Sequence, residues 1–122
     1  MVESIHYFKP GQDVTAVPSS AVTGARFVTI GEGGTYNRPV VAHSAAGDRP
    51  FGVVARDADK DEPVLVHTGG IVPVTAGAAL SAGGYVAAGA DGKAVAATDA
   101  ASAQGVVLAD AATDELASVH LY

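Results

Sequence analysis

Two histidines, His67 and His120, have the type and position that could do chemistry, because both end the same local sequence pattern. If the fold or a symmetry axis brought them together, their imidazoles could bind a metal ion. The alternative is a pair of exposed strand histidines inherited from one duplicated unit. The spacing does not force Asp57 or Asp61 toward His67, and no nucleophile accompanies them. We therefore favour the second interpretation and expect neither a metal nor a cofactor.

The acidic segment 57–62 resembles the beginning of a calcium loop. Asp57, Asp59 and Asp61 alternate as the first ligands of an EF-hand do. That loop also needs glycine at its sixth position and glutamate at its twelfth, where this sequence has Glu62 and Thr68. A weak calcium site stays open as an alternative, but we expect a solvated polar turn.

The sequence carries no motif of a common enzyme family: no Gly-x-Ser-x-Gly elbow, no phosphate-binding loop and no His-Glu-x-x-His pair. The glycine-rich segment 31–34 lacks the dinucleotide-binding spacing and predicts a hairpin loop. The absence of cysteine excludes disulfides and a cysteine nucleophile. We expect a protein without catalytic residues. A small β-barrel enzyme or cupin-like metal protein stays open only if His67 and His120 converge with carboxylates.

Charge and hydropathy exclude two classes of partner. Thirteen acidic residues against seven basic ones give a net charge of −6, and no basic stripe is present. Nucleic-acid affinity depends on clustered cations, so we expect no nucleic-acid partner. No apolar run is long enough to span a bilayer, and the first residues lack the pattern of a signal peptide, so we expect no membrane partner and synthesis in the cytoplasm.

The apolar residues are mostly small, since 48% of the chain is hydrophobic but it contains no Trp and only three Phe. Alanine and valine bury little area each, and a small domain leaves much of its surface exposed. Association with itself or with a larger partner would add the missing burial.

Short β-branched runs separated by Gly, Asp and Pro predict an all-β fold. Their spacing of about 8–12 residues is typical of a sandwich or barrel. The predicted strands cover residues 25–30, 39–43, 51–56, 63–68, 71–75, 85–88, 93–97, 105–109 and 116–122.

An internal repeat relates residues 52–67 to residues 105–120, with nine of the sixteen aligned positions identical. It predicts two copies of one strand–acidic turn–strand unit. We expect the two units to face each other and to bury a common apolar layer.

Residues 1–22 are predicted to form an extended N-terminal arm, and residues 23–122 the β-domain. Pro10-Gly11 and Val17-Pro18 are turn or extended signals, and the apolar residues of the segment have no helical spacing. An ordinary frayed terminus is the alternative. If the arm is separate, deletion of residues 2–20 leaves the domain folded.

The order of several segments resembles the small capsid decoration, or cement, proteins of tailed phages and prophages, especially those of actinobacterial hosts. The resemblance covers nearly the whole chain. It rests on residues 8–11 (Phe-Lys-Pro-Gly), 21–28, 51–55, 69–74, 76–86, 104–108 and 116–121.

The resemblance implies a compact β-domain in the virion, on the outer surface of the head, that binds the major capsid protein and stabilises the mature shell. It implies self-association as a homotrimer at three-fold positions, and assembly in the host cytoplasm. By position, the candidate capsid contacts are Ile5, Tyr7, Phe8, Lys9 and Pro10.

A second interpretation is a phage tail, fibre or head-surface domain that binds a receptor or carbohydrate. Such a domain needs exposed aromatic side chains on one face. Tyr36, Tyr85 and Tyr122 are the candidates, and they are scattered in the sequence.

Overall fold

Ten β-strands and two single-turn 3-10 helices make up the regular structure of residues 7–9 and 11–122, the part of the chain that the computed structural model describes. The strands are β1 (Val14–Pro18), β2 (Arg26–Ile30), β3 (Val40–His43), β4 (Gly52–Val54), β5 (Val64–His67), β6 (Gly70–Thr75), β7 (Tyr85–Ala88), β8 (Ala94–Ala96), β9 (Gly105–Val107) and β10 (Leu116–Leu121). The 3-10 helices are η1 (Ala90–Gly92) and η2 (Ala100–Ser102). The predicted all-β fold is confirmed.

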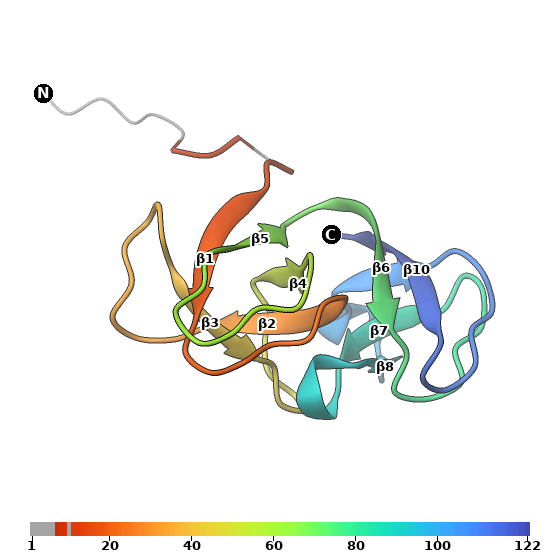
Figure 1. Cartoon of the computed structure of the whole chain (residues 1–122). Helices are drawn as coiled ribbons and strands as arrows, with labels where there is room; N and C mark the ends of the chain where they lie inside the picture. The colour runs from red at the N-terminus through yellow and green to blue at the C-terminus, as the bar shows by residue number, and fades with distance from the viewer. Residues whose placement is uncertain (1–6, 10) are drawn as a thin grey trace, which may run out of the picture.

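The strands form two units that lie side by side (Figure 1). In the first unit, β1 to β5 form a closed barrel in the order β1-β3-β2-β4-β5, with β1 and β3 parallel. In the second unit, β6 to β10 form a sheet in the order β6-β10-β9-β7-β8. A parallel bridge between Ala76 and Ala94 joins the end of β6 to β8, so the strands follow one another around both units in the same order.

The internal repeat extends over the whole of both units. Val53 pairs with His67 between β4 and β5, and the repeat-related Val106 pairs with His120 between β9 and β10. Each strand of the first unit thus has a counterpart in the second, in the order β1/β6, β2/β7, β3/β8, β4/β9 and β5/β10.

The first identical position of the repeat, Gly52 in one unit and Gly105 in the other, has the same structural role in both. A Cβ on Gly52 would collide with the His67 carbonyl oxygen, and one on Gly105 would collide with that of His120. Glycine is therefore required at the start of β4 and of β9, where each strand lies close to the strand it pairs with.

Two buried clusters take the place of the single shared apolar layer that was expected, and only one of them joins residues of both units. One buried cluster fills the first unit and includes Val28 and Val54. A second fills the second unit, and Phe27 and Val53 of the first unit pack into it. Because each unit curls around its own side chains, the contact between units is made by the outer face of β2 and β4. These strands therefore bury both of their faces.

The expected arm of residues 1–22 is also wrong in its second half. β1 completes the first barrel by pairing with β5 through Val14 and Ala16, and with β3 through its last residues. Val22 forms a bridge with Ala58. Burial alternates along β1, as it must in a barrel wall, so this segment belongs to the domain.

Candidate functional site

An open groove lined by aromatic side chains lies where three parts of the chain meet. These are the N-terminal segment (residues 7–9 and 11–13), the β5–β6 link and the C-terminus. Phe8, Tyr36, Phe51 and Tyr122 line it, together with Lys9 and glycine, threonine and glutamine residues. Figure 1 shows the start of β1, the β5–β6 link and the C-terminus on one side of the molecule. Tyr36 and Tyr122 are 61% and 65% exposed, and exposed aromatic side chains are typical of binding surfaces.

The N-terminal segment is fixed at the groove by hydrogen bonds. The Gln12 amide donates to the Lys9 carbonyl at 3.0 Å, and the Lys9 amide donates to Gln12 Oε1 at 2.9 Å. The Thr68 hydroxyl donates to the Gln12 carbonyl at 2.8 Å. Gly11, with φ of +77°, allows the turn and packs against Gly69. The chain therefore leaves the first barrel in a defined direction.

A stacked tyrosine pair forms one rim of the groove. The rings of Tyr7 and Tyr36 are 4.1 Å apart at their centroids and inclined by 27°. Both side chains remain largely exposed. Tyr36 belongs to the β2–β3 loop, residues 31–39, so the pair joins the N-terminal segment to the first barrel. Each ring limits the freedom of the other, which lowers the entropy lost when a partner covers them.

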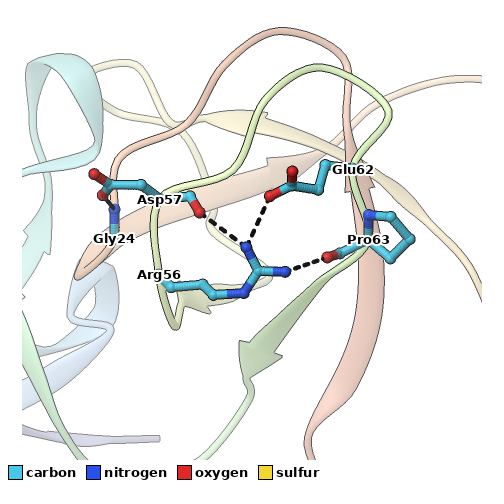
Figure 2. A network of polar contacts seen from close by, with 5 residues as sticks. All are labelled: Gly24, Arg56, Asp57, Glu62 and Pro63. Carbon is cyan, nitrogen blue, oxygen red and sulfur yellow. Dashed lines mark hydrogen bonds and ion pairs between the residues drawn. The ribbon is translucent and has the colours of Figure 1, made fainter.

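The acidic turn that resembled a calcium loop uses its groups within the protein (Figure 2). Arg56 donates to Glu62 Oε1 at 2.8 Å, and to the carbonyls of Asp57 and Pro63 at 3.0 and 2.7 Å. Asp57 accepts from the Gly24 amide at 2.8 Å. Throughout residues 7–9 and 11–122, no three His, Asp or Glu side chains lie close enough to share a metal ion. The turn is a structural element.

The two repeat-related histidines lie on different units and have different surroundings. His67 Nδ1 is 3.0 Å from Asp13 Oδ1 on the first unit. The His120 ring makes an edge contact with Tyr122 on the second unit, at 6.5 Å between centroids. Each has its own neighbours, and neither of these contacts involves the other histidine.

The predicted contact residues fall partly on the groove. Phe8 and Lys9 line it, and Tyr7 stacks on Tyr36 beside it. Ile5 and Pro10 lie outside the described residues. No pattern in the sequence indicated that Phe51 belongs here. Tyr36 and Tyr122, which looked scattered, come together because the β2–β3 loop and the C-terminus meet the same groove.

Comparison with known proteins decides the family. A model of the phage cement protein family matches residues 8–121, almost the entire chain. The chain belongs to the phage cement protein family. The resemblance noted in the sequence is confirmed, and so is its main implication, a structural protein that decorates the phage head.

A solved structure shares the fold of this cement protein. The head fiber gp8.5 N base of bacteriophage phi29 superposes with a TM-score of 0.77 at 24% sequence identity, over 91% of this chain and 93% of that one. No curated protein matches the sequence. Within the described residues, no helix has the length and hydropathy to cross a membrane.

Proposed function

We propose that this cement protein uses the aromatic groove and the N-terminal segment beside it to bind the major capsid protein on the outer surface of the mature head. The observation that carries the proposal is the gathering of Phe8, Tyr36, Phe51 and Tyr122 around one open groove. Tyrosine and phenylalanine are enriched at protein interfaces, and tyrosine often contributes much of the binding energy. The phi29 neighbour, described as the base of a head fiber, is consistent with a fold that sits on a phage head.

The protein would stabilise the shell through selective binding to its expanded form and through several contacts made at once. A protein that binds the expanded shell more tightly than its precursor stabilises the expanded shell by mass action. A homotrimer at a three-fold position would gain further, because its second and third contacts are intramolecular once the first has formed. The net charge of −6 keeps the free protein soluble until it docks.

We also propose that the protein has no catalytic role. The groove is lined by aromatic, small and amide side chains with one cation, Lys9. General acid–base chemistry needs a titratable pair within hydrogen-bond reach of a substrate. The His67–Asp13 pair is partly exposed, and neither residue lines the groove.

The same aromatic rims support a second candidate, a carbohydrate- or receptor-binding surface. Exposed ring faces such as those of Tyr36 and Tyr122 can stack on the apolar faces of sugars. This function would be independent of the capsid shell.

Co-sedimentation with purified heads tests the proposal. We expect the protein to pellet with expanded heads and to bind unexpanded precursors at least about tenfold more weakly, which corresponds to about 1.4 kcal/mol. Protein that remains in the supernatant with both particles would contradict the proposal. Retention on a glycan array in that case would favour the second candidate.

A further inference from the structure

The outer face of the first unit shows how one unit of this fold packs against the other. Phe27 on β2 and Val53 on β4 are paired neighbours that point outward, yet each is only 1% exposed. The second unit covers them, so the contact between two related units is already present within one chain.

The second unit carries the corresponding face without a cover. Tyr85 and Val106 are the counterparts of Phe27 and Val53, and they are paired in the same way. Tyr85 is 44% exposed. The row continues across the sheet through His120 to Ile71, which is 63% exposed. Leu108 and Leu116 extend this apolar face.

The other side of the intrachain contact is the surface of the second unit around η1. The Gly92 amide, in η1, donates to the Ser44 carbonyl at 2.8 Å, and its Cα lies so close to the Phe27 backbone that a Cβ would collide with it. η1 lies in the β7–β8 connection. Its counterpart in the first unit is the β2–β3 loop, residues 31–39, and that loop is exposed.

We propose that the face around Tyr85 and Val106 binds the β2–β3 loop side of the first unit of another copy, repeating the intrachain contact between molecules. The occupant is a second copy because each chain carries both halves of a contact that it already makes internally. The contact is head-to-tail, so it builds a closed ring when the rotation between copies permits. It rests on the proposed self-association and assigns the surface responsible.

Cysteine cross-linking tests the geometry, since the chain has no cysteine of its own. Ala97 is the counterpart of Ser44, because the Ala97 amide donates to the Tyr85 carbonyl as the Ser44 amide donates to that of Phe27. Thr98 is the next residue. Asn37 lies in the β2–β3 loop. A mixture of Thr98→Cys and Asn37→Cys proteins, free or bound to heads, should give cross-linked dimers, and each variant alone should not.

Two outcomes would overturn the proposal. Dimers formed by Thr98→Cys alone would show a two-fold contact in place of a head-to-tail one. No dimers in the mixture, either free or on heads, would show that these surfaces do not meet.

A charge placed on the face provides a second test. Tyr85→Glu should raise the concentration needed for self-association, measured by light scattering, by about tenfold or more. Leu65→Glu is the matched control, because Leu65 is 47% exposed on β5, away from both surfaces. Equal masses for the two variants and the unmodified protein at every concentration would contradict the proposal.

The β2–β3 loop also carries Tyr36 of the groove, so Tyr85→Glu, which lies on the other surface, is the variant that separates the two proposals. They fail in different ways. A protein that binds heads but never self-associates contradicts the self-contact and leaves the capsid role standing. A protein that self-associates through Tyr85 but does not bind heads contradicts the capsid role and leaves the self-contact standing.

Discussion

Several identical residues of the internal repeat have the same role in both units, although the two histidines do not. Asp57 Oδ1 accepts from the Gly24 amide and Asp110 Oδ1 from the Ala82 amide, both at 2.8 Å. Asp61 and Asp114 both adopt positive φ, at 64° and 68°. At these aspartate positions the repeat therefore records backbone requirements.

The two strand glycines provide a test at this scale. Gly52→Ala and Gly105→Ala each force a Cβ against a strand carbonyl, and we expect each to lower the free energy of unfolding by about 1–3 kcal/mol. Gly31→Ala is the control, because a Cβ there makes only ordinary contacts. Denaturant unfolding of the three variants measures the difference, and equal midpoints would contradict this explanation.

His43 predicts a pH dependence of stability. Its Nε2 accepts from the Thr23 amide at 2.9 Å, and burial, followed by the nearby Arg26, lowers its pKa below the ordinary 6.5. The negative charge of Asp91 acts in the opposite direction and only reduces the shift. The unfolded chain therefore takes up a proton that the folded chain resists, so this contribution to stability is complete above pH 6.5 and declines below it.

Melting temperatures between pH 7.5 and pH 5 measure this effect. We expect the unmodified protein to lose more stability over that range than His43→Gln, which keeps an acceptor but does not titrate. Parallel pH profiles for the two proteins would show that His43 does not contribute.

At the scale of elements, local patterns predicted β2 to β10, and each of these strands lies at or within two residues of its expected range. β1 was missed because Gly11 and Pro18 bracket a short run of small side chains that looked like an arm. Closure into a barrel could not be predicted either. It depends on parallel pairing of β1 with β3, far along the chain, and such pairing leaves no local signal.

Two deletions separate the arm from β1. Removing residues 2–20 takes away β1 and leaves the edges of β3 and β5 unpaired, so we expect the first unit to lose cooperative unfolding. Removing residues 2–9 stops before β1, so we expect the circular dichroism spectrum and melting temperature to be retained while head binding weakens. A 2–20 deletion that melts like the full chain would contradict the place of β1 in the barrel.

At the scale of the whole molecule, the groove is a product of the fold. Its aromatic residues come from positions 8, 36, 51 and 122, and they lie together only because residues 8–12, the β2–β3 loop, the start of β4 and the C-terminus meet in the fold. The sequence identified the N-terminal aromatics and the family. It could not locate the groove, because the contacts that build it join residues far apart in the chain.

The affinity of groove variants for expanded heads tests the central claim most directly. Tyr36→Ala removes a rim of the groove and the stacking partner of Tyr7, whereas Leu65→Ala removes a comparably exposed side chain elsewhere. In a co-sedimentation titration we expect Tyr36→Ala to weaken binding about tenfold or more, and Leu65→Ala to bind like the unmodified protein. Unchanged binding by Tyr36→Ala, with the fold intact, would show that the capsid contact lies on another surface.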